Sequence, residues 1–241
     1  MSALQGRRLG PGLTDRMVDL MGSLPVAPTS EDLPRALSGH LWLLTAADGD
    51  GIRLTKAGYL PPAVVGEFAP HVPTMMGWLH RITREENSQP LLQFRQHLIR
   101  VGLLRSSRGV LASTVAGRKC AEDPTKLWSH LVSRFLPAKP AYTHLVSALI
   151  VLHLATSEGK INTDAIADTM TALGWSQEGR RPIDSDVVYW DYNRVWSGIG
   201  NIGWQKDPST FNRTLTPEGK AFAFHLLFSQ APNPDIDAPV A

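Results

Sequence analysis

Apolar residues along this chain recur mainly at the spacing of amphipathic helices, and three short stretches depart from that spacing. Each has an apolar run, a polar or Gly-containing turn, a second short run, and then Ser or Thr and a Gly that open a helix. The three stretches are Leu41 to Leu60, Val101 to Cys120 and Ile202 to Phe222. The pattern predicts three β-hairpins, each followed by a helix.

Local residue chemistry supports these hairpins and the helices after them. Gly, Asp, Ser and Pro occupy the predicted turns at 48–51, 106–109 and 206–209, where such residues are favoured. Thr55 and Thr216 can cap the first turn of the helices that follow, and Pro217 suits a first helical position. The middle copy lacks this arrangement, because Ser113, Thr114 and Val115 stand there instead.

Helical spacing also precedes each predicted hairpin. The third follows helices at about 143–157, 163–173 and 185–199, and the second follows an interrupted stretch at 67–79 and an amphipathic helix at 89–102. The first follows two short stretches at 13–21 and 31–37, and its own helix at 57–69 is expected to serve the second unit as well.

Three helices and a hairpin make a winged helix, in which the second and third helices form the helix-turn-helix and the hairpin is the wing. The predicted fold class is therefore mainly α with short β-hairpins (α+β), arranged as tandem winged-helix-like units. The expected divisions are a flexible segment 1–12, units at 13–66, 67–140 and 141–228, and a disordered tail at 229–241.

Composition limits the class of protein and the cellular compartment that we expect. Of 241 residues, 43% are hydrophobic and 19% charged, which is enough for a packed core. The single cysteine, Cys120, excludes an internal disulfide and is expected to be a buried apolar residue. No signal peptide is recognisable, and the longest apolar stretch, 145–155, is far shorter than the roughly 20 residues of a membrane span. We expect a cytoplasmic protein without a membrane partner.

Charge is distributed unevenly. The net charge is only +2, but between Trp78 and Lys119 eight Arg and Lys residues accompany only Glu85 and Glu86, so that segment carries +6 and the remainder −4. A concentrated positive charge suits a polyanion such as double-stranded DNA, although an ordinary solvated basic face has the same composition.

The middle unit offers the best candidate DNA-contacting groups. Arg and Gln can pair with guanine and adenine edges in the major groove, and arginines of a wing reach phosphates or the minor groove. The predicted nucleic-acid-binding residues are Arg81, Arg84, Gln93, Arg95, Gln96, Arg100, Arg105, Ser107 and Arg108. The alternative is an amphipathic helix that merely exposes a polar face.

No catalytic site, metal site or cofactor is predicted. The chain has no Gly-rich phosphate loop and no nucleophile elbow, and its histidines include no pair three or four residues apart. Asp184, Asp186 and Asp191 can be imagined as a carboxylate cluster, but a helix start beside Asp184 explains them better.

The third unit contains five aromatic residues within a short stretch of sequence: Tyr189, Trp190, Tyr192, Trp196 and Trp204. They can stack on bases of a single strand, but we expect Trp190 and Trp196 in a core or a contact between units. If the protein instead binds a protein partner, Tyr189, Tyr192 and Trp196 are the predicted contact residues. A homodimer is also considered, since a symmetric DNA target requires one.

One region resembles a known family. The runs LTKAGYLPPAVV from Leu54, WLHRITREE from Trp78, GLLR from Gly102 and DPTKLW from Asp123 resemble the C-terminal region of the plasmid ORF-three-like family. The resemblance covers about residues 40 to 135 and implies an association with mobile elements, without an established activity. The sequence therefore favours a non-catalytic winged-helix DNA-binding protein, a regulator or accessory factor of a mobile element; the alternative is a winged-helix protein-interaction module.

Overall fold

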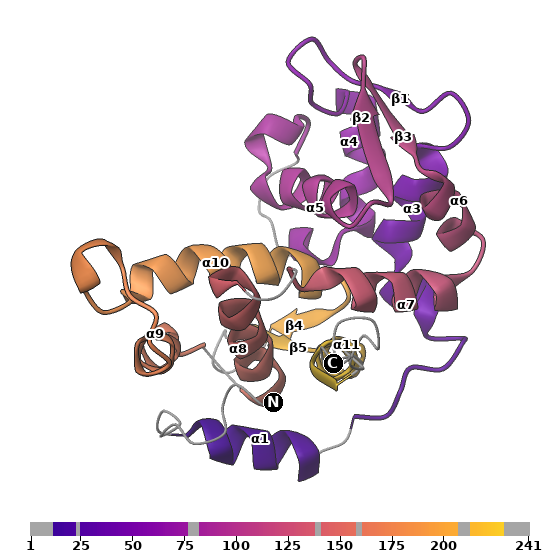
Figure 1. The fold of residues 1–241 in the computed structure, drawn as a ribbon. Coiled ribbons are helices and arrows are strands. Elements are labelled where there is room, and N and C mark those ends of the chain that lie inside the picture. Colours follow the sequence, from indigo (N-terminus) through magenta and orange to yellow (C-terminus); the bar gives the residue numbers. More distant parts are fainter. Residues whose placement is uncertain are drawn as a thin grey trace, which may run out of the picture.

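The computed structural model describes residues 12–22, 25–76, 82–137, 141–157, 161–206 and 213–228. In these ranges the chain is mainly helical, with two small antiparallel sheets (Figure 1). The helices form two groups in mutual contact: α2 to α7, and α1 with α8 to α11. A mainly α fold with short β-hairpins is thus confirmed. The tail 229–241 and, except for residue 12, the segment 1–12 lie outside the described residues.

The first group carries a three-stranded sheet. In chain order it contains α2 (Leu33–Ala36), α3 (Ser38–Ala46), β1 (Ile52–Arg53), α4 (Pro62–Phe68), the 3-10 turns η2 (Ala69–His71), η3 (Pro73–Met75) and η4 (Glu85–Asn87), α5 (Gln89–Arg100), β2 (Leu104–Ser107), β3 (Val110–Ser113), α6 (Val115–Ala121) and α7 (Pro124–Phe135). The strands are antiparallel in the order β1-β3-β2. One sheet therefore joins the first and second predicted units.

The first predicted hairpin is wrong, because its first strand is helical. Residues 41–46 belong to α3, and only β1 is extended, pairing with β3 rather than with a neighbour of its own. Leu43 and Leu44 of this run are fully buried. A short apolar run suits a buried helix as well as a buried strand, so periodicity alone did not separate the two.

The helix predicted at 57–69 begins later, at Pro62. Residues 55–59 form a turn instead: the Thr55 amide donates to the Tyr59 carbonyl at 2.8 Å, and the Thr55 hydroxyl accepts from the Tyr59 amide at 3.1 Å. Gly58 has a φ of 83°, which suits glycine. Thr55 therefore closes a turn and does not cap a helix, and α4 starts where proline is tolerated.

The second predicted hairpin is confirmed, and the strands of the third pair as predicted, while its turn residues 207–209 lie outside the described residues. β2 pairs with β3, and β4 (Trp204–Lys206) pairs with β5 (Arg213–Leu215). Thr216 caps the following helix, α11 (Pro217–Phe228), by accepting from the Gly219 amide at 3.3 Å. The middle copy is capped as well, because the Thr114 hydroxyl accepts from the Gly117 amide at 3.0 Å.

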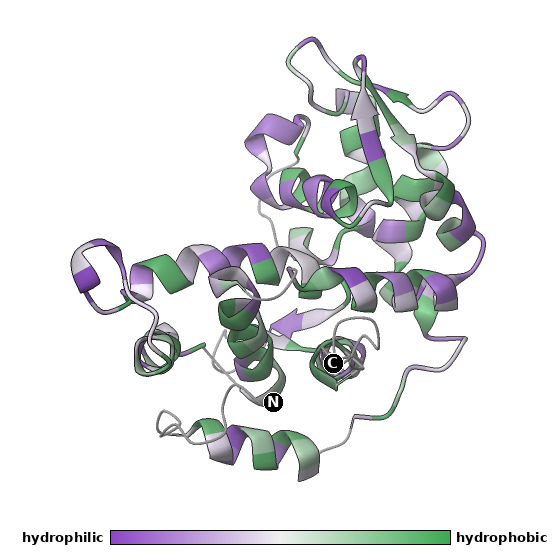
Figure 2. Cartoon of the chain, in the orientation of Figure 1, coloured by the Kyte–Doolittle hydropathy of each residue, from purple (hydrophilic) through white to green (hydrophobic). Residues whose placement is uncertain are grey.

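The second group is built around one apolar helix, α8 (Tyr142–Thr156), which is coloured hydrophobic over most of its length in Figure 2. It packs against α1 (Leu13–Gly22), α9 (Thr163–Ala172), α10 (Ser185–Ile199) and α11, and the 3-10 turn η5 (Glu178–Arg180) lies between α9 and α10. The predicted helices at 143–157, 163–173 and 185–199 are thus confirmed. No helix in the described ranges is long and apolar enough to cross a membrane.

The two groups meet where α5 and α7 pack against α10 and α11. Gly198 of α10 lies so close to Phe135 of α7 that a methyl group there would clash with the phenyl ring. Trp128 of α7 donates through its indole nitrogen to His225 Nδ1 of α11 at 3.0 Å. Since apolar burial continues across this junction, the groups share one core.

A buried ion pair anchors the turn at 55–60 to α5. The Arg95 guanidinium donates to both Glu85 carboxylate oxygens, at 2.7 and 3.0 Å, and to the Gly58 carbonyl at 3.3 Å. The same carboxylate accepts from the Leu60 amide at 2.7 Å. Glu85 is 1% exposed and Arg95 6%, so both charges depend on this network for compensation.

Removing one partner of this pair should be strongly destabilising. We expect Glu85→Ala to lower the free energy of unfolding by about 3 to 5 kcal/mol, because it leaves the Arg95 charge buried without a counterion. Urea unfolding followed by circular dichroism measures this change. The neighbouring Glu86→Ala is the control, since Glu86 is exposed and its loss should cost less than about 0.5 kcal/mol.

The double variant Glu85→Ala/Arg95→Met tests the cause. It should recover a large part of the lost stability, because no unpaired charge then stays in the core. A double variant no more stable than Glu85→Ala would show that the lost hydrogen bond to Leu60, and not the stranded charge, dominates.

Buried histidines make stability sensitive to acid. Burial lowers the pKa of His40 to about 3 and that of His153 to about 4, and the Nδ1 atom of each is buried without a hydrogen-bond partner. An unfolded histidine titrates near about 6.5, so below that pH only the unfolded chain binds the proton. Each should therefore reduce stability by about 1.4 kcal/mol per pH unit as the pH falls toward the folded pKa.

We expect His40→Leu to flatten the fall in unfolding free energy between about pH 6 and pH 4.5, by about 1.4 kcal/mol per pH unit, because the variant has one titrating group fewer. Urea unfolding across that range measures the slope. Parallel slopes for the variant and the wild type would contradict the assignment.

Candidate nucleic-acid interface

The β2–β3 hairpin presents basic residues on its outer face. Residues directly opposite each other in antiparallel strands lie on the same side of a sheet. The register pairs Arg105 with Ala112, and Ser107 and Arg53 both with Val110, while Leu111 pairs with Ile52 on the buried side. Arg53, Arg105 and Ser107 therefore share one exposed face.

The hairpin turn adds a third arginine. Arg108 and Gly109 form a two-residue turn with φ values of 50° and 75°, the left-handed conformation that matches strand twist. Among the described residues, none of Arg53, Arg105 and Arg108 forms an ion pair. The positive charge of the hairpin is thus not neutralised by nearby carboxylates.

Helix α5 offers a polar stripe next to this hairpin. Its exposed or half-buried polar residues follow helical spacing on one side, and Phe94 and Leu98 are buried on the other. The stripe consists of Gln89, Gln93, Gln96 and Arg100. Three amides and a guanidinium in one row can donate to and accept from base edges and phosphates.

Arg95 does not belong to this surface, which corrects the predicted set. It is buried and satisfied by Glu85 and Gly58, as described above. The sequence does contain a signal for this placement, because Arg95 is four residues after Leu91 and three before Leu98 and so shares their buried side. Glu85, at the right distance to neutralise it, was visible only in three dimensions.

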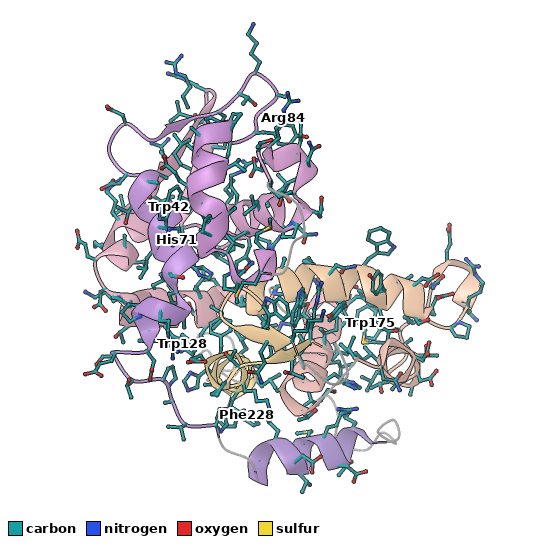
Figure 3. All side chains as sticks on the ribbon, turned by 180° about the vertical axis from the view of Figure 1, so that it is seen from behind. Trp42, His71, Arg84, Trp128, Trp175 and Phe228 are labelled. Atoms are coloured by element: carbon teal, nitrogen blue, oxygen red, sulfur yellow. The ribbon has the colours of Figure 1, made fainter. Side chains whose placement is uncertain are left out.

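The other predicted arginines differ in availability. Arg84 points outward at the edge of the first group (Figure 3) and forms an exposed ion pair with Glu86 at 3.4 Å. Arg100 is exposed and donates to His97 Nδ1 at 3.2 Å; partial burial and the charge of Arg194 on α10 lower its pKa. Arg81 lies outside the described residues.

Arg53 is a candidate that the sequence interpretation missed. The predicted DNA-contacting residues all lie between Arg81 and Arg108, in the second predicted unit. The alternation of buried Ile52, exposed Arg53 and buried Leu54 was the available signal. Pairing of β1 with β3 brings Arg53 beside residues that follow more than 50 positions later in the chain.

The aromatic residues of the second group are buried and exposed in a different pattern from the one predicted. Trp196 is 7% exposed and lies in the core as predicted, but Trp190 is 75% exposed and the prediction of a buried position is wrong. Tyr189 is 53% exposed, and Tyr192 is half-buried between Tyr189 and Trp196. Of the predicted partner contacts, Trp196 is therefore not accessible.

Two carboxylates near α10 have structural roles, one as a helix cap and one in an ion pair. Asp184 caps the helix by accepting from the Asp186 amide at 2.9 Å, as predicted, and Asp191 pairs with Arg194 at 2.9 Å. Within the described ranges, no three His, Cys, Asp or Glu side chains gather in a way that could hold a metal ion.

No family model matches the chain, and no curated protein or solved structure matches it either. The resemblance of residues 40 to 135 to the plasmid ORF-three-like family thus stays a prediction from the sequence.

The backbone conformation of the hairpin turn leads to a prediction about stability. A left-handed conformation is unfavourable for arginine and less so for asparagine, so Arg108→Asn should raise the free energy of unfolding by about 0.5 kcal/mol while removing the charge. Urea unfolding checks this. A loss of stability would mean that the Arg108 side chain makes a contact that outweighs the backbone preference.

Proposed function

We propose that this chain is a non-catalytic winged-helix protein that binds double-stranded DNA through α5 and the β2–β3 hairpin. The observation that carries the proposal is the unpaired basic face of the hairpin, formed by Arg53, Arg105 and Arg108, beside the Gln-rich stripe of α5. Surface arginines without counterions suit phosphates, and a row of amides suits base edges.

The order of elements in the first group supports this proposal. A helix, a short strand, two helices and a hairpin, α3-β1-α4-α5-β2-β3, is the order expected of a winged helix whose third helix is α5. One departure is residues 69–88, which separate α4 from α5 by far more than the short turn of a helix-turn-helix. The described part of this insertion contains the 3-10 turns η2, η3 and η4, and Glu85 ties it to α5.

The second group has a similar order, α8-α9-α10-β4-β5, but suits DNA less well. Asp184 precedes α10, and the exposed part of the helix carries Asp186 and two aromatic side chains. Carboxylates at that position repel phosphates, so DNA binding is assigned to the first group.

The hairpin arginines should dominate salt-dependent binding. We expect Arg105→Ala/Arg108→Asn to weaken binding to a mixed-sequence duplex about tenfold or more at low salt, and to reduce the slope of log affinity against log salt by about 2. Fluorescence anisotropy across a salt series measures both quantities.

Arg180→Asn/Arg181→Ala is the matched control, because it also removes two exposed arginines, one of which, Arg180, has a φ of 61°. It should bind like the wild type. Equal losses of affinity in both double variants would show that DNA binding depends on overall charge and not on the hairpin. No binding of the wild type at low salt would overturn the proposal.

Gln93→Ala/Gln96→Ala separates base reading from phosphate binding. Amide side chains contribute no charge, so this variant should lower the affinity for preferred sequences while leaving the salt slope unchanged. A changed slope would show that α5 has moved on the duplex.

The exposed Trp190 favours a second candidate function, that of a winged-helix protein-interaction module without DNA binding. Under this alternative the contact residues are Tyr189 and Trp190, joined by the half-buried Tyr192. Failure of the duplex experiment directs attention to this face.

A further inference from the structure

Helices α5 and α10 pack together where α10 has a glycine, and α10 runs beneath α5 in Figure 1. A methyl group on Gly198 would lie 3.4 Å from Cε1 of the His97 ring of α5. About one turn from this contact each helix carries an arginine: Arg100 follows His97 by three residues, and Arg194 precedes Gly198 by four. The two arginines therefore flank the junction between the two groups.

The charges of the two arginines act on each other and on the histidine at the junction. Burial, and after it the charge of Arg194, lowers the pKa of Arg100. Burial, with the charges of Arg100, His40 and Arg194, lowers the pKa of His97 well below its usual value, so His97 is neutral. Two like charges held close together repel each other, and an anion near both would stabilise them.

Each guanidinium is held through one of its nitrogens. Arg100 Nη2 donates to His97 Nδ1 at 3.2 Å, and Arg194 Nη2 donates to the Ser147 hydroxyl and the Asp191 carboxylate, both at 2.9 Å. In the described part of the chain, Nε and Nη1 of both arginines have no acceptor. A planar guanidinium fixed at one nitrogen presents its other N–H groups in a defined direction.

The carboxylates at this junction do not balance the two arginines. Asp191 pairs with Arg194, whereas Arg100 has no ion pair with any residue that the structure describes. Two guanidinium groups and one carboxylate leave a net positive charge. Arg100 is exposed and the Arg194 side chain is 29% exposed, so an anion can approach both from solvent.

We propose that Arg100 and Arg194 bind one phosphate group between them. Guanidinium groups match phosphate oxygens through parallel N–H donors, and these charge-assisted hydrogen bonds are stronger than neutral ones. A phosphate of the DNA backbone and a free phosphate ion offer the same oxygens.

The assignment of this phosphate to DNA rests on the proposed function. Arg100 is the last residue of the Gln-rich stripe of α5, so a duplex lying on that stripe has phosphates near it. Asp186, which repels DNA at the start of α10, precedes Arg194 by eight residues, about two helical turns. The DNA-binding surface would thus include one residue of the second group.

Inorganic phosphate tests the pair without DNA. Thermal unfolding of the full chain is followed over a series of phosphate concentrations, with sodium chloride of matched ionic strength as the reference, because a ligand of the folded state raises Tm. Arg194→Gln should weaken phosphate binding about tenfold, since it removes charge-assisted hydrogen bonds. Arg35→Gln is the matched control: Arg35 is also paired with a carboxylate, Glu218 at 2.6 Å, but lies on α2, and this variant should bind phosphate like the wild type.

Asp191→Asn separates phosphate binding from a structural role. It removes the carboxylate that partly neutralises Arg194, so phosphate should bind about threefold more tightly at low salt. Arg194→Gln and Asp191→Asn break the same ion pair, so a merely structural role would make them act alike. Circular dichroism verifies that each variant is folded. Changes of phosphate affinity in the same direction would contradict the proposal.

Fluorescence anisotropy with the mixed-sequence duplex distinguishes the two sources of phosphate. If the phosphate belongs to DNA, Arg194→Gln should reduce the slope of log affinity against log salt by about 1. Weaker binding of inorganic phosphate with an unchanged slope would assign the pair to a free phosphate ion. A wild type that binds no duplex would contradict the proposed function, while the phosphate titration would still decide on the pair. The proposal is overturned if Arg194→Gln behaves like Arg35→Gln with both probes.

Discussion

The ion pair between Glu85 and Arg95 determines how the first group is assembled. Two charges are removed from water, which is unfavourable unless each hydrogen bond is made. The turn at 55–60 must therefore converge with two segments that follow at least 25 positions later, the 3-10 turn at 85–87 and the middle of α5. Once the turn is fixed, β1 ends beside the hairpin and α4 starts at Pro62. The exposed face of the hairpin and the stripe of α5 are set relative to each other by the same constraint.

Local patterns predicted much of the secondary structure. The helices at 89–100, 163–172 and 185–199 have apolar residues at helical spacing, the apolar stretch at 142–156 is too long for a strand, and two hairpins were identified by their turn residues. The short run at 41–46 was ambiguous because four apolar residues suit either a strand or a helix. Whether this run is a helix or a strand depends on the elements that pack against it, and the elements that contact α3 lie elsewhere in the sequence.

The candidate surface was predicted less completely than the fold. Arg105, Ser107 and Arg108 are exposed as expected, since a hairpin turn projects its side chains. Arg95 was misplaced because its counterion comes from another element, and Arg53 was missed because a strand partner is not encoded locally. Part of the positive charge of the segment 78–119 is therefore neutralised, because Arg84 and Arg95 have carboxylate partners. The arginines of the hairpin are the ones that keep an unpaired charge.

The close approach at Gly198 has a mechanical consequence. Because Gly198 has no side chain, the Phe135 ring of α7 packs directly against the backbone of α10, whose 15 residues form one continuous helix of roughly 22 Å. The position of α10 relative to the first group is therefore set by a contact with the helix backbone and does not depend on the rotamer of a long side chain on α10.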